Sequence, residues 1–169
     1  MDATELRSLQ APIKDRYRSD PDAAVITLKA QGSLDDGGIA CKVETGRALA
    51  VAGLHPASGG SGAELCSGDM LLEALVACAG VTLKAVATAL EIPLRKGLVK
   101  AEGDLDFRGT LGVDKGAPVG FRAIRLTFEV DADAPQEKLD QLLKLTERYC
   151  VVFQTLNHRP ELAVTAMKG

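Results

Sequence analysis

One long apolar segment constrains the fold of this chain more than any other feature. Residues 69–91 have the spacing of a helix, and Pro93 marks where that helix must stop. The body of the segment carries only three charged side chains, those of Glu73, Lys84 and Glu91. A helix that is apolar on nearly all sides is normally buried on most of them. The sequence therefore predicts a buried central helix around which the remaining elements pack.

Strand-like segments stand on both sides of this helix. Five segments alternate apolar and polar residues or are rich in β-branched ones: 23–31, 39–45, 47–54, 98–108 and 119–130. The first three predict a β-meander, and the last two predict an antiparallel hairpin. A second helix is predicted over 134–146; it continues, or restarts after a kink, through Phe153, and a closing strand follows over 162–167. Because strands and helices are grouped and do not alternate, the predicted fold class is α+β.

The length of 169 residues favours one compact domain. Residues 1–22 are charged and contain Pro12 and Pro21, so we expect an N-terminal arm with at most a short helical turn. Residues 23–169 then form a single α+β domain. No internal repeat is visible.

Composition argues against several classes of partner. The net charge is −3, aromatic residues make up 4%, and tryptophan is absent, so neither a basic stripe nor a stacking platform for nucleic acid is expected. Residues 1–7 lack the basic start and apolar stretch of a signal peptide. The most apolar run, 70–81, is interrupted by Glu73 and is too short to span a bilayer. We expect a cytoplasmic protein with no nucleic-acid or membrane partner.

The four cysteines, at positions 41, 66, 78 and 150, form no CxxC pair and do not suggest a disulfide scaffold. Cys78 lies in the middle of the long helix among alanine, valine and leucine, where a buried packing thiol and a reactive thiol are both plausible. We expect Cys41 and Cys66 to serve in packing only.

Cys150 follows a charged pair, Glu147 and Arg148. A nearby guanidinium stabilises a thiolate, and on a helix Glu147 would face the same way as Cys150. The alternative is that both charged side chains are simply solvated.

Other candidate sites are weaker. His55, His158, Cys41 and Cys66 contain no closely spaced pair of zinc ligands, so no metal is expected. The loop Gly59–Gly62 lacks the lysine that ends a phosphate-binding loop and is interpreted as a linker. No cofactor is expected.

Three stretches of the chain together match a known pattern. They are the glycine-rich loop 59–62 with the helix start 67–78, the strand 99–109, and the second-cysteine segment 149–156. The first reads as a glycine-rich loop, an acidic residue and then Leu-Leu-x-Ala-Leu-x-x-Cys. In these stretches the chain resembles the osmotically inducible protein C and organic hydroperoxide resistance family, from about residue 23 to the end.

The resemblance implies an intertwined homodimer and a cofactor-free peroxidase with two cysteines. Cys78 would attack the O–O bond of an organic hydroperoxide and become a sulfenic acid. Cys150 would then form a disulfide with Cys78, which an external dithiol reduces. The family's two central helices pack together, with the sites near the subunit boundary.

The chain departs from the family pattern at three positions. The family commonly has proline after the second cysteine, where this chain has Val151. Its best-studied peroxidases place a glutamate ten residues before the first cysteine, where this chain has Gly68 followed by Asp69. They also use an arginine in the first hairpin turn, which here is Asp-Asp-Gly-Gly at 35–38.

Thiolate stabilisation would therefore have to come from other residues. Asp69 is a candidate for the acidic role, as well as for favourable interaction with the helix dipole. The guanidinium would come from one of four arginines: Arg16, Arg18, Arg47 or Arg148. Two other functions stay open: a small-molecule-binding stress protein whose catalysis is lost, and a redox sensor using a Cys78–Cys150 disulfide.

Overall fold

The computed structural model describes residues 2–19, 31–34, 40–44, 49–112 and 114–167. Its helices are α1 (Ala3–Ser19), η2 (Pro56–Ser58, a short 3-10 turn), α2 (Ser67–Ala89), α3 (Phe107–Thr110), α4 (Gln136–Tyr149) and α5 (Val151–Asn157). Its strands are β1 (Gln31–Leu34), β2 (Ala40–Glu44), β3 (Leu49–Gly53), β4 (Leu65–Cys66), β5 (Leu94–Leu105) and β6 (Phe121–Ala132). The predicted α+β class is confirmed.

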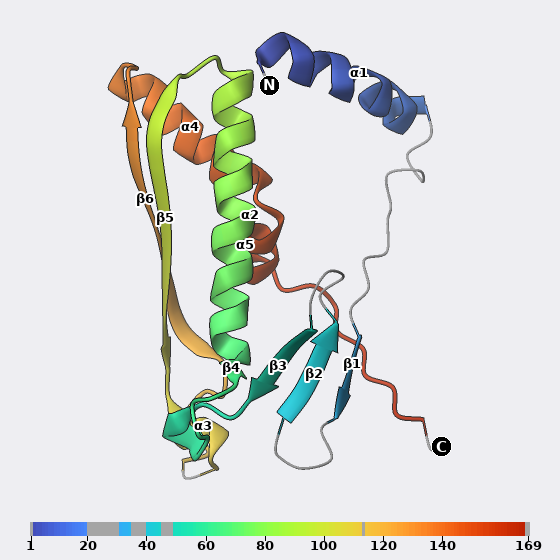
Figure 1. Cartoon of the computed structure of the whole chain (residues 1–169), viewed down its shortest axis with the longest axis vertical. Helices are drawn as coiled ribbons and strands as arrows, with labels where there is room; N and C mark the ends of the chain where they lie inside the picture. Colours follow the sequence, from blue (N-terminus) through green and yellow to red (C-terminus); the bar gives the residue numbers. More distant parts are fainter. Residues whose placement is uncertain (1, 20–30, 35–39, 45–48, 113, 168–169) are drawn as a thin grey trace.

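Helix α2 forms the spine of the fold, as predicted. The long antiparallel hairpin of β5 and β6 runs along one flank of α2, and α4 and α5 pack against another (Figure 1). Leu75, Leu83 and Leu142 are buried where these elements meet. Full burial of a leucine side chain contributes about 1.5–3 kcal/mol, so these contacts are a main source of stability.

The hairpin is two-faced because successive side chains of a strand point to opposite sides. Its inner face is apolar and packs on α2 through residues such as Val99, Leu126 and Phe128. Its outer face is a solvated row of ion pairs, among them Arg95–Asp131 at 2.6 Å. This alternation explains why the hairpin was predictable from sequence, within two to four residues at each end.

The sequence predicted that α2 is buried on most of its sides, but within the single chain only part of α2 is covered. We call the uncovered side, which consists of Leu71, Ala74, Ala77 and Val81, the open side of α2; Val81 is 73% exposed. Within the described part of the chain, α2 is the one helix long and apolar enough to cross a membrane, although the shorter run 70–81 did not suggest this. Core helices of soluble proteins meet the same criteria.

The N-terminal sheet has the strand order β1-β2-β3-β4. The first three strands pair antiparallel, which confirms the predicted meander, and the two-residue β4 adds in parallel to β3. The strand β1 begins at Gln31, whereas most of the segment expected as the first strand, 23–30, lies outside the described residues, as does the turn 35–38.

The N-terminal arm is more ordered than expected: it is the 17-residue helix α1. Its start is a reciprocal cap, in which the Glu5 amide donates to the Asp2 carboxylate at 2.8 Å and the Asp2 amide donates to Glu5 at 2.9 Å. The cap stabilises the helix start, and Pro12 is accommodated within the helix. An exposed ion pair of 3.0 Å between Arg7 and Glu91 links α1 to the end of α2.

The closing strand expected over 162–167 is not formed. Residues 158–167 have no helix or strand, and Leu162, Val164 and Met167 are 78%, 97% and 93% exposed. A strand exists only when a neighbouring strand completes its hydrogen bonds. In the single chain this apolar segment has no strand partner among the described residues.

Candidate active site

The structure brings the two cysteines singled out by sequence into direct contact. Cys78 lies in the middle of α2, and Cys150 lies between α4 and α5; both thiols are free, and they are within hydrogen-bonding reach of each other. Cys150 is 1% exposed, while Cys78 is half-buried at the border between the covered side and the open side of α2. The pair can therefore form a disulfide without large rearrangement, and the more exposed partner can meet a substrate.

A helix break positions Cys150. Its backbone is extended, with φ −73° and ψ 107°, so α4 ends and α5 begins at this residue. Of the two alternatives that the sequence left open, a continuous helix and a restart after a kink, the structure has the restart. The Cys150 amide donates to the Thr146 carbonyl at 2.9 Å, and the Cys150 carbonyl accepts from the Gln154 amide at 2.9 Å. Both backbone groups of this buried residue are thus satisfied.

The same break exposes backbone donors at the cysteine pair. The first amides of any helix have no carbonyl of their own helix to bind. Those of Val151 and Val152, at the start of α5, are the backbone donors whose hydrogen bonding lowers the pKa of Cys78. Hydrogen bonding by the Thr82 hydroxyl and the Cys150 thiol lowers this pKa as well.

These donors separate the acidities of the two thiols. Burial alone would raise the pKa of Cys78, but hydrogen bonds from the Val152 amide, the Cys150 thiol, the Val151 amide and the Thr82 hydroxyl outweigh it and lower that pKa. Burial raises the pKa of Cys150, although the Phe153 amide opposes this effect, and a negative charge on Cys78 raises it further. Cys78 is therefore the thiol prepared to lose its proton, and Cys150 the one that keeps it.

An apolar environment surrounds the pair. Cys150 packs with Leu75 and Ala79 in one buried cluster, which Cys78 and Phe153 join from its edge. A cavity of about 330 Å³ opens beside this cluster between α2, β6 and α5. Its lining is mainly apolar, and the two polar exceptions are Arg122 and Asn157. The apolar lining residues are Leu75, Phe121, Ala123, Ile124, Leu126, Phe153 and Leu156.

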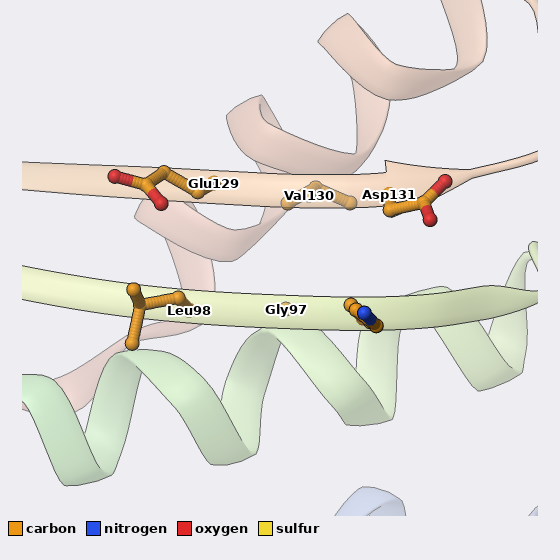
Figure 2. A pocket seen from close by; sticks show the side chains of 6 residues that line it. Gly97, Leu98, Glu129, Val130 and Asp131 are labelled. Atoms are coloured by element: carbon orange, nitrogen blue, oxygen red, sulfur yellow. The ribbon is translucent and has the colours of Figure 1, made fainter.

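A larger hollow of about 620 Å³ on the surface is not part of this site. All of its lining residues belong to the paired strands β5 and β6, among them Gly97, Leu98 and Val130 (Figure 2). It holds no cysteine, and the carboxylates of Glu129 and Asp131 point away from each other along β6 (Figure 2).

The charged residues expected to tune Cys78 lie elsewhere. Asp69 is exposed in the first turn of α2, nine residues and therefore roughly 13 Å along the axis from Cys78. Glu147 and Arg148 are exposed, and the Arg148 guanidinium lies 5.7 Å from the centre of the Tyr149 ring. Glu147 does not face the same way as Cys150, because the helix ends between them.

The structure describes the other three candidate arginines only in part or not at all. Arg16 and Arg18 are on α1, but their side chains, like that of Cys41, are outside the described part of the chain. Arg47 lies outside the described residues altogether. Val151 and Val152, which do touch the thiol, were missed as donors because backbone contacts between distant segments leave no side-chain signal.

Of the residues weighed as metal or phosphate ligands, His55 and Gly60 have structural roles. His55 stacks on Phe107, with ring centroids 5.0 Å apart, and its Nδ1 accepts from the Ala57 amide at 3.0 Å. His158 is exposed at the end of α5. Gly60 is required because a β-carbon there would lie 1.6 Å from the Leu54 carbonyl oxygen. Within the described ranges, no three His, Cys, Asp or Glu side chains are grouped to hold a metal.

Comparison with models of protein families shows to which family the chain belongs. The model of the family described as OsmC-like protein matches residues 60–165, more than half of the chain. The chain belongs to the OsmC-like family. The match contains both cysteines, α2 and the hairpin, and the resemblance noted in the sequence is confirmed. Comparison with curated proteins found no match.

Solved structures of this family share the fold. An OsmC-like protein from Mycoplasma pneumoniae aligns with a TM-score of 0.65 at 18% identity, covering 79% of this chain and 89% of its own. An organic hydroperoxide resistance protein OsmC from Legionella pneumophila aligns with a TM-score of 0.61 at 17% identity, covering 80% and 92%. The organic hydroperoxide resistance protein OhrB of Bacillus subtilis aligns with a TM-score of 0.52 at 20% identity, covering 80% and 94%.

Gly68, where the resemblance led us to look for a glutamate, is packed beneath the hairpin. A β-carbon at this position would lie 3.5 Å from the Cys66 sulfur, from Leu105 and from Phe121. In this member of the OsmC-like family, Gly68 therefore packs against neighbouring residues and provides no carboxylate. The described donors to Cys78 are backbone amides, a thiol and a hydroxyl.

Proposed function

We propose that this protein is a thiol-dependent peroxidase that reduces organic hydroperoxides to alcohols in defence against oxidative stress. The observation that carries the proposal is the contact between Cys78 and Cys150, with backbone donors that lower the pKa of only one of them. Two relatives of the same fold are named organic hydroperoxide resistance proteins, which supports the same role here.

The proposed cycle balances without a cofactor or metal. The Cys78 thiolate attacks the terminal hydroperoxide oxygen, the O–O bond breaks, and one proton completes the alcohol, leaving Cys78 as a sulfenic acid. The Cys150 thiol then forms the Cys78–Cys150 disulfide and releases water. An external dithiol reduces this disulfide to two thiols and is itself oxidised to a disulfide.

Steady-state turnover tests this cycle. Reduced protein is supplied with cumene hydroperoxide and dithiothreitol, and alcohol formation is followed. We expect many turnovers per chain. Oxidation of the cysteine pair without sustained turnover would favour the redox sensor, and absence of any thiol oxidation would favour the small-molecule-binding protein.

The cavity beside the cysteine cluster is the proposed site for the organic part of the substrate. It shares Leu75 and Phe153 with the cluster that holds Cys150. An apolar group gains binding free energy in such a cavity, whereas hydrogen peroxide has no apolar group to place there. We therefore expect a preference for bulky organic hydroperoxides.

Leu156→Asn tests the role of this cavity. Leu156 lines the cavity but is 39% exposed, so the substitution should leave the fold intact. We expect the KM for cumene hydroperoxide to rise roughly tenfold through lost apolar contact, while the rate with hydrogen peroxide stays unchanged. Leu111→Asn, at an exposed position away from the cavity, is the matched control. Equal effects on both peroxides would contradict this role.

We also propose that two chains form an intertwined homodimer. The open side of α2 is an apolar surface bordering Cys78, and the unpaired segment 162–167 is a further apolar surface. Association would remove both from water and would bring a second copy next to the cysteine pair. We expect such a dimer in the cytoplasm, with a dithiol reductant and no membrane or nucleic-acid partner.

Val81→Glu tests the homodimer. Val81 is the C-terminal residue of the open side and is 73% exposed. A carboxylate there would be desolvated at an interface, so we expect association to weaken at least about 100-fold. Sedimentation velocity at micromolar concentration measures it. Val119→Glu, at a loop position that is 64% exposed, is expected to leave the dimer intact. A dimeric Val81→Glu protein would exclude this surface.

A further inference from the structure

Thr82 lies one helical turn beyond Cys78, and its hydroxyl donates to the Cys78 carbonyl oxygen at 2.8 Å. Residues four apart are neighbours on one face of a helix, so the same hydroxyl lies on the side of α2 that carries the Cys78 thiol. Hydrogen bonding by this hydroxyl is also one of the causes that lower the pKa of Cys78. A hydroxyl has only one proton, so it can donate to the carbonyl oxygen or to the sulfur, but only to one of them at a time.

We propose that Thr82 is a positioning residue whose hydroxyl turns from the Cys78 carbonyl to the Cys78 sulfur when the thiolate forms. The inference rests on the proposed function in one respect: Cys78 is taken as the reacting thiol. In this proposal the Thr82 hydroxyl provides part of the stabilisation of the Cys78 thiolate. The family pattern had led us to expect that stabilisation from an arginine and a glutamate.

The carbonyl can give up this hydrogen bond at little cost. Because Cys78 and Thr82 both lie inside α2, the Cys78 carbonyl also accepts the helical hydrogen bond from the Thr82 amide. A carbonyl oxygen has two lone pairs but is satisfied by one donor. The thiolate gains more, since hydrogen bonds to a charged acceptor are stronger than those to a neutral one.

Substitution of Thr82 leaves the other ionisable side chains around Cys78 in the protein unaltered. Cys150 touches the sulfur, and Glu73 and Lys84 are exposed on α2. At the end of α4, Glu147, Arg148 and Tyr149 are exposed, and the strand residues packed against the cluster are apolar. A change in Cys78 acidity on substitution of Thr82 would therefore report the hydroxyl itself.

The test is the pH dependence of Cys78 alkylation by iodoacetamide, with the modified residue identified by peptide mass. Thr82→Val replaces the hydroxyl with a methyl group of similar shape. We expect the midpoint to rise by roughly 0.5–1 pH unit and the rate at pH 7 to fall roughly 3–10-fold. Thr82→Ser restores the hydroxyl and is expected to restore the profile.

Thr88→Val is the matched control, because the Thr88 hydroxyl donates to the Lys84 carbonyl at 2.8 Å on the same helix without a thiol nearby. It should leave the Cys78 profile unchanged. Thr82→Ala provides a second variant if Thr82→Val does not fold. A folded variant lacking the hydroxyl but keeping the wild-type midpoint would overturn the proposal, as would a serine variant that behaves like valine. Alkylation needs no peroxide, so a failure of the peroxidase proposal would be seen separately.

Discussion

A Cys78→Ser protein is expected to lose organic hydroperoxide turnover by at least about 1,000-fold, the order of loss that follows removal of a nucleophile. A serine hydroxyl stays protonated at neutral pH and does not attack an O–O bond. The substitution is nearly isosteric and the position is only half-buried, so the fold should persist. Consumption of cumene hydroperoxide with dithiothreitol as reductant measures the loss.

Cys66→Ser is the matched control for this result. Cys66 is also a free, half-buried cysteine, at the start of the same helix, but it lies away from the Cys78–Cys150 pair. We expect its variant to turn over at the wild-type rate. Sustained turnover by the Cys78→Ser protein would refute the proposed nucleophile.

The pH profile of the wild-type reaction gives the same assignment a second readout. The thiolate is the reactive form. Its fraction rises with pH and levels off once the pH exceeds the pKa of Cys78. Because hydrogen bonds lower that pKa, the rate should level off at a lower pH than for an unperturbed thiol.

A Cys150→Ser protein is expected to react once and then stop. Serine can still donate to the Cys78 sulfur, so the first oxidation should proceed, but no disulfide can form. Turnover should fall roughly 100-fold, and Cys78 should accumulate as a sulfenic acid, seen as a mass gain of about 16 Da. Excess peroxide should carry it on to the irreversible sulfinic acid.

Dimedone trapping identifies the oxidised residue in this variant. We expect one adduct per chain, on Cys78, and none in the wild-type protein once its disulfide has formed. Full dithiol-driven turnover without Cys150 would show that the contact between the two thiols is not needed for the cycle.

The elements that show a regular local pattern of apolar and polar residues were predictable from the sequence. The apolar run of α2 and the alternation of β5 and β6 follow from local periodicity, whereas a continuous last helix and one that restarts near Cys150 were both open. The two cysteines stood out only through the motifs around them, and the structure then brought them together.

Most of the failures depend on partners that lie far away in sequence, and one depends on a break in a helix. Residues 162–167 alternate like a strand but find no neighbouring strand among the residues that the structure describes. Glu147 was expected beside Cys150 because helical spacing was extended across a residue where the helix ends. The donors on Val151 and Val152 are backbone groups, which sequence patterns do not reveal.

Two missed features did have local signals. Asp2 and Glu5 have the spacing of a capping box, which would have predicted the start of α1. Thr82 stands four residues after Cys78, the spacing at which side chains of a helix meet. Each signal was weak alone, because charged termini and threonines in helices are common.

The central claim is that Cys78 and Cys150 form a peroxide-driven redox pair, and intact-mass analysis tests it most directly. Fully reduced protein is measured before and after one equivalent of cumene hydroperoxide, and the product is then mapped by peptide mass. The account predicts a loss of about 2 Da per chain, located in a Cys78–Cys150 disulfide that dithiothreitol reverses. An unchanged mass, or oxidation located at Cys41 or Cys66 instead, would contradict it.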